Sequence, residues 1–390
     1  MIYLDNAATS YPKPLNVRKA VSSSFSYSAN PGRAGHRLSI KASEEIYNCR
    51  NKIADMFGVD NPEKVIFTSG CTVALNTVIK GILSKGDHVI VSSIEHNSVL
   101  RPLQKLSDSG FIEFSVCDIY PEDDEKTLNS FRQSIKKNTK LAICSHASNV
   151  FGILSPVSKL AALCRYYNIL FCIDASQSAG LFDINLSDIG ADFLCAPGHK
   201  GLYGPMGIGF MIVNSVIPDS LYEGGTGSSS ENFSQPSVLP DKFESGTVNL
   251  HGIAGLSAGI DFVKSYGVNR IRENESRIMS YLLSNLQNVD GITLYQDNFK
   301  NCAPILSFNI DGINSEDVAL ILDRRFGIAV RAGIHCSPAA HKKYGTLDTG
   351  TVRVSPSVFT TFNDINYLIK AVSYINKYKN KLINLENTHL

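Results

Sequence analysis

Short apolar runs alternate with longer amphipathic segments along the first part of the chain. The runs are rich in Val, Ile and Phe, which is typical of buried strands, and the segments between them have helical spacing. The predicted strands are 65–68, 89–91, 112–116, 141–145, 170–173, 193–195 and 208–213. The predicted helices are 39–57, 73–83, 99–106 and 156–167. This alternation predicts an α/β fold whose mostly parallel, seven-stranded sheet is covered by helices on both faces.

The later part of the chain has a different pattern and predicts a smaller α+β domain. Its expected strands are 305–310, 328–330 and 351–354, and its expected helices are 315–325 and 363–378. A Gly-, Ser- and Pro-rich stretch, 224–248, is expected to be a long surface loop. We therefore predict three parts. Residues 1–14 form an arm that joins the small domain, residues 15–260 form the large domain, and residues 261–390 form the small domain.

Composition narrows the classes of function. The chain has 390 residues, 43% apolar and 19% charged, with a formal net charge of +1, so a nucleic-acid or polybasic membrane-binding surface is not expected. No window approaches the roughly 20 apolar residues that span a bilayer. The amino-terminal residues lack the pattern of a secretory signal. The nine cysteines form no Cys-x-x-Cys pair, which predicts a reduced, cytoplasmic protein without a metal site.

One lysine lies in a stretch packed with glycine and proline, residues 195–205, between two predicted strands. Glycines allow the backbone to approach a ligand closely, and prolines stiffen a turn. The commoner object with this pattern is a hairpin that carries a solvated lysine. Lys200 becomes a candidate for chemistry only if other polar residues meet it.

Polar residues do follow other predicted strands. Asp174 follows strand 170–173, His96 follows strand 89–91, and Gly70-Cys71-Thr72 separates a strand from a helix. Ligands of parallel sheets bind beyond the carboxyl ends of the strands, so these residues are expected to meet. Taken singly, the aspartate is equally typical of a helix cap, and the histidine of a structural hydrogen bond.

Together these groups suit pyridoxal 5′-phosphate (PLP). Its aldehyde bonds covalently to a lysine, and its ring nitrogen needs an acidic partner, which Lys200 and Asp174 would supply. The helix start after Gly70 would offer backbone N–H groups to the phosphate. A nucleotide-binding loop of the Gly-x-x-x-x-Gly-Lys-Ser/Thr type is absent, as is Gly-x-Gly-x-x-Gly after a strand.

Motifs along nearly the whole chain resemble the class V aminotransferase superfamily, in its cysteine desulfurase/selenocysteine lyase branch. The matching segments are 3–8, 68–72, 95–98, 148–152, 174–177, 198–200, 246–247, 331–336 and 352–355. The run Arg331-Ala332-Gly333-Ile334-His335-Cys336 resembles the Suf-type group of that branch. The resemblance implies a PLP enzyme of fold type I that acts as a homodimer.

The resemblance also implies roles toward the cofactor. Lys200 would hold the cofactor and move protons at the substrate carbon, Asp174 would pair with the ring nitrogen, and His96 would stack on the ring. Contacts to the ring oxygen are implied for Gln177 and Asn149. Contacts to the phosphate are implied for Gly70, Cys71, Thr72, His199 and, from the second subunit, Thr247.

The same resemblance implies a site for the substrate. Arg353 would bind its carboxylate as a bidentate fork, a geometry that suits guanidinium. Asn149, Arg331, Ala8 and His36 would complete this site. In a desulfurase, Cys336 as thiolate would attack the sulfur of L-cysteine, become a persulfide and leave L-alanine, and a sulfur-acceptor protein would follow as partner. Arg331 and His335 are neighbours that would favour a thiolate.

Three positions depart from the Suf-type pattern. Cys71 replaces a usual threonine, Pro197 replaces a usual serine, and Ile334 replaces a frequent histidine. The first two positions touch the phosphate in that group, and each lost hydroxyl would cost roughly 0.5–1.5 kcal/mol of cofactor binding. Selenocysteine lyase and other class V chemistry therefore remain alternatives. A non-catalytic partner protein is disfavoured, because a degenerate site would have no physical need for all four of these residues together: Lys200, Asp174, His96 and Arg353.

Overall fold

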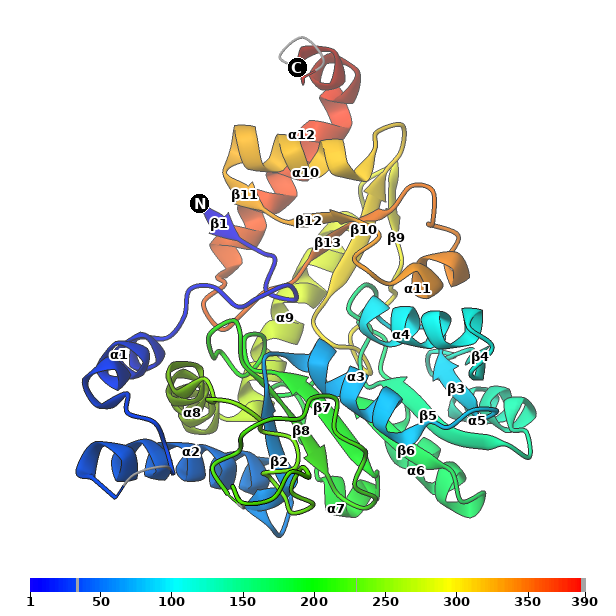
Figure 1. Cartoon of the computed structure of the whole chain (residues 1–390). Helices are drawn as coiled ribbons and strands as arrows, with labels where there is room; N and C mark the ends of the chain where they lie inside the picture. Colours follow the sequence, from blue (N-terminus) through cyan, green and yellow to red (C-terminus); the bar gives the residue numbers. More distant parts are fainter. Residues whose placement is uncertain (33–34, 229, 387–390) are drawn as a thin grey trace.

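The computed structural model describes residues 1–32, 35–228 and 230–386 (Figure 1). Its main sheet has seven strands in the order β2-β8-β7-β6-β5-β3-β4. Their bounds are β2 (Val65–Thr68), β3 (His88–Ser92), β4 (Glu113–Cys117), β5 (Thr139–Ser145), β6 (Leu170–Asp174), β7 (Phe193–Pro197) and β8 (Gly209–Val213). Strands β4, β3, β5, β6 and β7 are parallel, and β8 is antiparallel to both of its neighbours. The predicted seven-stranded, mostly parallel sheet is confirmed.

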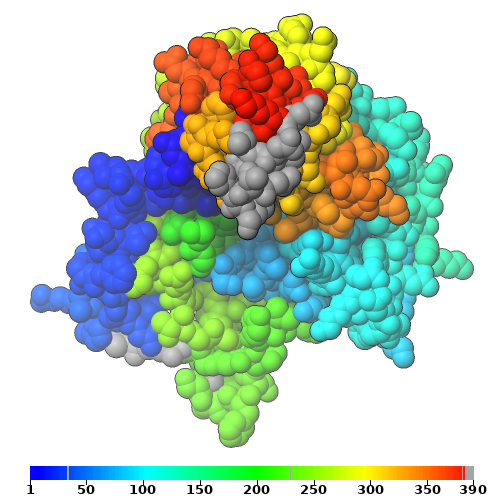
Figure 2. Space-filling model, turned by 90° about the horizontal axis from the view of Figure 1, so that it is seen from above, coloured from blue at the N-terminus to red at the C-terminus, as the bar shows by residue number. Residues whose placement is uncertain are grey.

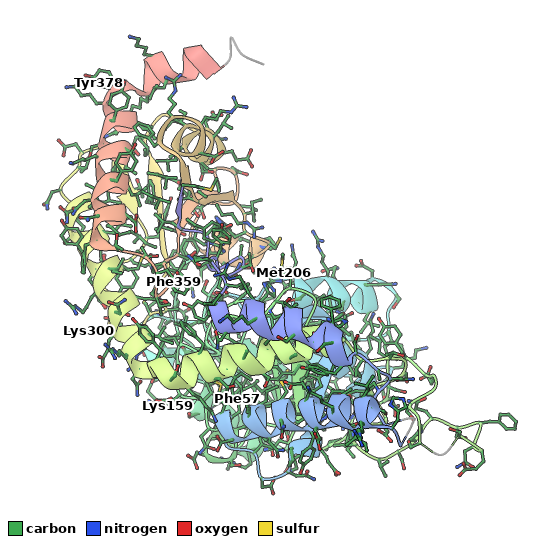
Figure 3. The ribbon with its side chains drawn as sticks, turned by 90° about the vertical axis from the view of Figure 1, so that its left-hand side faces the viewer. Phe57, Lys159, Met206, Lys300, Phe359 and Tyr378 are labelled. Carbon is green, nitrogen blue, oxygen red and sulfur yellow. The ribbon has the colours of Figure 1, made fainter. Side chains whose placement is uncertain are left out.

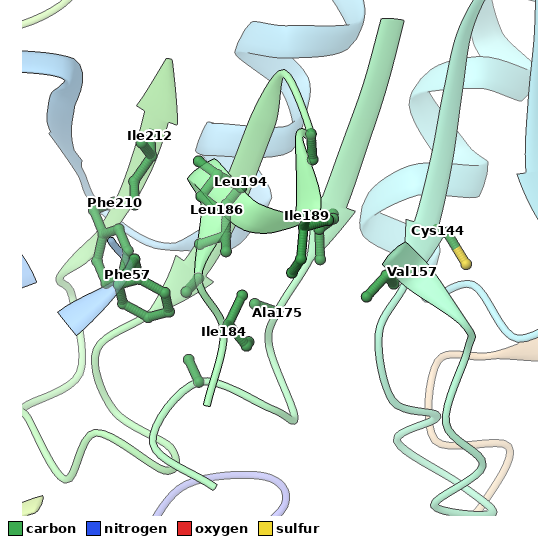
Figure 4. Packing of buried hydrophobic residues seen from close by; sticks show 14 of the residues in the cluster. Phe57, Cys144, Val157, Ala175, Ile184, Leu186, Ile189, Leu194, Phe210 and Ile212 are labelled. Carbon is green, nitrogen blue, oxygen red and sulfur yellow. The ribbon is translucent and has the colours of Figure 1, made fainter. Parts of the chain in front are cut away.

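Successive side chains of the strands supply two separate apolar cores, one on each face of the sheet. Phe67 packs into one cluster and Ile66 into the other, and Leu194 and Cys195 divide in the same way. This alternation is the period of a strand, and burial on both faces explains why the runs are continuously apolar. Figure 4 shows part of the first cluster, where Phe57 lies against Phe210.

Helices between the strands cover these faces. Their bounds are α3 (Cys71–Ile82), α4 (Asn97–Asp108), α5 (Asp124–Ser134), α6 (Val157–Tyr166) and α7 (Leu186–Ile189). Helices α3 and α4 pack on the face that holds Ile66, whereas α6 packs on the face that holds Phe67. The predicted βα alternation therefore places the first turns of α3 and α4 at the carboxyl edge of the sheet.

Three helices from distant parts of the chain form a layer beside this sheet. Helix α8 (Leu250–Tyr266) lies between α1 (Leu15–Ser24) and α2 (Arg37–Met56), and α9 (Val268–Leu286) leads away from it toward the second sheet (Figure 3). The loop that precedes α8 contains neither helix nor strand among its described residues, 224–228 and 230–248. This agrees with the predicted long surface loop, which projects from one side of the molecule in Figure 2.

The second sheet has four antiparallel strands, in the order β12-β13-β10-β9. Its strands and helices are β9 (Ile292–Leu294), β10 (Leu306–Ile310), α10 (Ser315–Phe326), β12 (Arg331–Gly333), α11 (Pro338–Lys343), β13 (Thr351–Val354) and α12 (Phe362–Glu386). Side chains of α9, α10 and α12 bury one apolar cluster against this sheet. This part is α+β, as predicted.

The first residues of the chain join this second part. Strand β1 (Ile2–Tyr3) pairs in parallel with β11 (Ile328–Ala329), and Leu4 is fully buried in the cluster of the second sheet. The division into 1–14, 15–260 and 261–390 stays a prediction, and its second boundary falls inside α8. Across the described ranges, no helix combines the length and the apolar character needed to cross a membrane.

Candidate active site

A cavity of about 380 Å³ opens where the carboxyl edge of the main sheet faces the second sheet. Twelve of the residues singled out from the sequence line it. They are Ala8, Gly70, Cys71, Thr72, His96, Asn149, Asp174, Gln177, His199, Lys200, Arg331 and Arg353. Pro197 also lies in this lining, together with His335, which comes directly before Cys336. The carboxyl-edge rule thus brings residues from distant parts of the sequence to one place.

Lys200 and Asp174 meet because their strands are neighbours. Asp174 ends β6 opposite Cys195 of β7, and Lys200 lies in the turn that joins β7 to β8. Burial lowers the pKa of Lys200, and the Asp174 carboxylate opposes this shift. A lysine whose pKa is lowered carries more of the neutral amine, which is the form that attacks an aldehyde.

Backbone hydrogen bonds hold the turn around Lys200, and they fix the position from which the lysine side chain extends. Gly198 N donates to Ile208 O at 2.9 Å, and Gly204 N donates to Gly198 O at 2.8 Å. A Cβ at Gly201 would overlap the carbonyl oxygen of Ala179, so glycine is required for this close backbone approach. The glycines that drew attention in the sequence therefore pack the turn against its neighbouring segment.

His96 forms another part of the wall, at the start of α4. It is the N-cap of that helix, and its Nδ1 accepts from Ser98 N at 3.0 Å, which leaves the ring proton on Nε2. Burial, with a further effect of the Lys200 charge, lowers the pKa of His96 to about 4. The imidazole is therefore neutral near pH 7.

A buried carboxyl group beneath His96 ties two strand ends together. Glu95 accepts from Ser145 N at 2.6 Å and from Ser145 Oγ at 2.9 Å, and it also bonds the hydroxyl of Ser92. Its burial raises the pKa of Glu95 from the ordinary 4.5 to about 8. The end of β3, which leads to His96, is thereby anchored to the end of β5.

The other end of the cavity offers donors for an anion. Helix α3 begins at Cys71, so its first turn faces the cavity with backbone N–H groups that lack intrahelical acceptors. Among the described residues, the buried Nδ1 of His199 has no hydrogen-bond partner. A phosphate would satisfy both kinds of group.

Arg353 is the charged residue of β13 that faces this cavity. Its side chain is 1% exposed, and Nη2 donates to Asp5 Oδ1 at 2.6 Å while Nη1 donates to Asn149 O at 2.8 Å. Within the described part of the chain, Nε is buried without a partner. A buried guanidinium with an unused donor that lines a cavity suits a carboxylate ligand.

Cys336 lies in a tight turn that is pinned to the main sheet. His335 and Cys336 have positive φ angles of 54° and 59°. Asn97 N donates to Cys336 O and Asn149 Nδ2 to His335 O, each at 2.7 Å, and Ser337 Oγ donates to Asn149 Oδ1 at 2.6 Å. The backbone of the cysteine turn is therefore held by the first turn of α4 and by one asparagine side chain.

The sulfur of Cys336 is half-buried and has a cation beside it. Arg331 Nη2 lies 3.8 Å from Sγ, and the same arginine lines the cavity. Cys336 itself is not among the lining residues. A guanidinium at this position is the kind of neighbour that stabilises a thiolate.

Besides Cys336, two predicted site residues lie outside this cavity. Thr247 lines a different hollow, next to Glu244, and His36 caps the start of α2 by accepting from Ser39 N. Sequence reasoning also left Asp5 and Ser337 without assigned contacts, although Asp5 lies inside a motif that carried the resemblance. The amide of Gln177 donates to Ala7 O at 3.0 Å, so in this structure it is engaged with the residues 2–8 segment.

The sheet, the lysine turn and the paired carboxylate together define a class of protein. The family model of class V aminotransferases matches residues 2–368, and the chain belongs to this family. The predicted resemblance and the predicted α/β architecture, fold type I, are confirmed.

Relatives within this family that are similar to the chain are named as cysteine desulfurases. A probable cysteine desulfurase of Methanothermobacter thermautotrophicus is 34% identical over 94% of this chain and 92% of its own length. Another, of Halalkalibacterium halodurans, is 31% identical over 97% and 94% of the two chains. The solved structure of a cysteine desulfurase from Thermococcus onnurineus is similar with a TM-score of 0.88 and 32% identity, and it covers 96% of this chain and 94% of that chain.

Proposed function

We propose that this chain is a PLP-dependent cysteine desulfurase, which converts L-cysteine to L-alanine and carries the sulfur as a persulfide on Cys336. The proposal rests on one observation: residues suited to the cofactor and the residues around Cys336 lie at the same cavity. Lys200 and Asp174 come from adjacent strand ends, and Arg331 links their cavity to the Cys336 sulfur. The names of the relatives support the same activity.

The residues present fit PLP. Lys200 is a half-buried lysine whose pKa is lowered, and Asp174 is a carboxylate beside it. The start of α3 and the unpartnered His199 Nδ1 suit a phosphate. His96 would form the side wall against the ring. When bound, the cofactor supplies an electron sink next to the substrate's α-carbon.

The chain's own groups would perform the remaining tasks. Arg353 binds the substrate carboxylate through its buried guanidinium, whose Nε is free for this purpose. The Lys200 amine would accept a proton at the substrate α-carbon and return one to the product. His96, neutral near pH 7, presents Nε2–H as a hydrogen-bond donor.

Sulfur transfer belongs to Cys336. Its thiolate attacks the substrate sulfur, so a bond forms between the two sulfurs while the Cβ–S bond of the substrate breaks. The electron pair of the broken bond stays with the substrate, and protonation at Cβ completes alanine. Arg331 next to Sγ stabilises the attacking thiolate. A sulfur-acceptor protein, or a reductant in its place, then removes the outer sulfur.

Purified protein incubated with PLP and L-cysteine tests this proposal. We expect an absorbance band of the bound cofactor, equal amounts of alanine and sulfide in the presence of a thiol reductant, and a persulfide on Cys336 detected by mass spectrometry. L-Selenocysteine is the matched alternative substrate. Turnover of selenocysteine at least 100-fold faster than cysteine, or amino transfer to a keto acid without sulfide, would replace the desulfurase assignment.

We also propose that the working form is a homodimer. Large apolar side chains are exposed on the layer of helices that neighbours the 224–248 loop: Phe25, Leu38, Ile40, Tyr47 and, in the loop, Phe233. Exposed large apolar side chains that gather in one region are typical of a protein interface. Thr247 and His36, which lie away from the cavity of their own chain, would then serve the partner's site.

Light scattering after size exclusion should give twice the mass of the chain. Thr247→Ala should weaken PLP binding roughly three- to tenfold without changing that mass, because one hydroxyl donor is lost. A fully active monomer contradicts the dimer proposal and leaves the desulfurase proposal intact.

A further inference from the structure

Cys71 is one of the two departures from the Suf-type pattern that line the cavity. Its side chain lines the cavity at the first position of α3 and is 8% exposed. The sequence alone associates this position with the phosphate. The structure directs the sulfur elsewhere, because Cys71 Sγ lies 3.6 Å from Asp174 Oδ1.

The thiol at this position stays protonated. Burial raises the pKa of Cys71 well above its ordinary value, the Asp174 carboxylate raises it further, and Ser176 and Lys200 lower it by less. A thiolate here would place two negative charges side by side in a water-poor wall. Cys71 is therefore an S–H donor, and the carboxylate oxygen of Asp174 is the acceptor beside it.

The donors around Asp174 converge on one of its two oxygens. Oδ1 accepts from Ser176 N at 2.9 Å as well as from the thiol, whereas no hydrogen bond to Oδ2 is recorded among the described residues. The backbone of Asp174 is fixed separately, since its carbonyl oxygen accepts from His146 N at 2.9 Å. Rotation of the carboxylate is thus the freedom that the thiol restricts.

We propose that Cys71 is a positioning residue whose thiol holds the Asp174 carboxylate by Oδ1 and so leaves Oδ2 for the protonated ring nitrogen of PLP. This rests on the cofactor of the proposed function. It assigns to Cys71 a role toward the ring end of the cofactor in place of the phosphate end. The side chain acts through Asp174 and itself touches no reacting atom.

Equilibrium binding to the apoprotein separates these roles, with PLP and with a 1-deaza analogue that has carbon in place of the ring nitrogen. Cys71→Ala should raise the Kd for PLP about three- to tenfold, the size of one ordinary hydrogen bond, because a thiol is a weak donor. Cys71→Ser, which keeps a donor, should restore the wild-type Kd within about twofold. Binding of the deaza analogue should be the same in all three proteins, because it lacks the group that Asp174 meets.

Several results overturn the proposal. Equal weakening of PLP and analogue by Cys71→Ala would mean that the sulfur only packs the wall. An unchanged Kd for PLP would mean that the thiol has no role in binding, and equal losses in the Ala and Ser variants would exclude the donor. Thermal unfolding of each apoprotein checks folding, and Cys71→Val, of similar size but without a donor, replaces the Ala variant if that one is unfolded.

The two proposals fail separately. If wild-type protein binds PLP with the expected dependence on Cys71 but releases no sulfide from L-cysteine, the desulfurase reaction is wrong and the role of Cys71 stands. If wild-type protein releases sulfide and Cys71→Ala binds both ligands as the wild type does, the role of Cys71 is wrong and the reaction stands. Wild-type protein that binds no PLP would contradict both.

Discussion

Two cysteines of the candidate site have opposite surroundings: Cys71 lies in the lining of the cavity, and Cys336 lies outside that lining, next to Arg331. Cys71 stands in the wall made by strand ends of the main sheet, buried beside the Asp174 carboxylate. Cys336 stands in a turn of the second sheet's domain, half-buried beside the Arg331 guanidinium. The same side chain is thus a hydrogen-bond donor at Cys71 and a nucleophile candidate at Cys336. Neighbouring charge and access to water decide which role a thiol takes.

The backbone conformation also differs between the two cysteines. The Cys71 wall is built from regular strands and a helix start, whose positions the apolar cores determine. The Cys336 turn has two non-glycine residues with positive φ and depends on a few hydrogen bonds to the opposite wall. Such a conformation persists only where its surroundings hold it. The first wall should therefore tolerate the loss of one polar contact better than the turn does.

Removal of the Cys336 sulfur should have the largest effect. Cys336→Ala should lower sulfide release from L-cysteine more than about 100-fold, because the nucleophile of the transfer step is gone. The PLP absorbance band should remain, since the lysine turn and Asp174 are untouched. Sulfide assays and spectra measured on the same preparation check both statements.

Cys302→Ala is the matched control for that variant. Cys302 is the other cysteine in the described chain that is not fully buried, and it lines a separate hollow beside Tyr344. Its loss should leave sulfide release within about twofold of the wild type, the range of surface changes. Sulfide release that survives in Cys336→Ala and disappears in Cys302→Ala would reverse the comparison.

Arg353→Lys tests whether the turn side of the cavity also binds the substrate. A lysine keeps the charge and loses the fork, so the KM for L-cysteine should rise about 10- to 100-fold with a smaller change in kcat. The PLP band of the resting protein should be unchanged. Steady-state kinetics measure the split, and a pure fall in kcat would argue against carboxylate binding by Arg353.

Glu95→Gln tests whether the buried carboxyl group at the end of β3 makes the stability of the protein depend on pH. The folded-state pKa of Glu95, about 8, is above its ordinary 4.5, so the folded protein binds more protons than the unfolded chain between these values. Wild-type stability should therefore fall as pH rises from about 5 to 8, by up to about 1.4 kcal/mol per pH unit, and the Gln variant should lack this component. Denaturant unfolding at pH 5 and pH 8 measures it. Parallel pH profiles in the two proteins would show that Glu95 is ionised when folded.

Ser337→Ala should give the smallest effect, confined to the turn. It removes the hydroxyl that donates to Asn149 Oδ1, and the rate of persulfide formation should fall about three- to tenfold. The Kd for PLP should be unchanged. Rapid-quench measurement of the Cys336 persulfide checks the rate. A weakened affinity for PLP together with an unchanged rate of persulfide formation would mean that Ser337 serves cofactor binding and not the Cys336 turn.

The difference between the walls also explains what could be predicted. Apolar runs and their spacing were sufficient for the seven strands, and the carboxyl-edge rule was sufficient to bring Lys200 to Asp174, because both depend on local pattern and simple topology. Helix α9 was missed because the first half of Val268–Leu286 is dominated by charged and polar residues that obscure its apolar face.

The contacts of the turn could not be predicted in this way. A cysteine does not by itself predict a positive φ, as found at Cys336. The hydrogen bonds between Asn149 and the turn join residues that are 186 and 188 positions apart in the sequence. The direction of the Cys71 sulfur depends on a single rotamer, which sequence does not specify. Motifs located these residues, and only the fold shows what each one touches.

The segment of residues 2–8 has a consequence for how the protein is made. Its partners come late, because Asp5 pairs with Arg353 across 348 residues and Ile2 pairs with Ile328. On the ribosome this stretch emerges before its partners and has no place to bind until Ile328 and Arg353 have been synthesised. Arg353, the proposed ligand of the substrate carboxylate, therefore receives its counter-ion only after both segments have been made. Shortly before that step, a nascent chain would hold a finished main sheet and an incomplete catalytic centre.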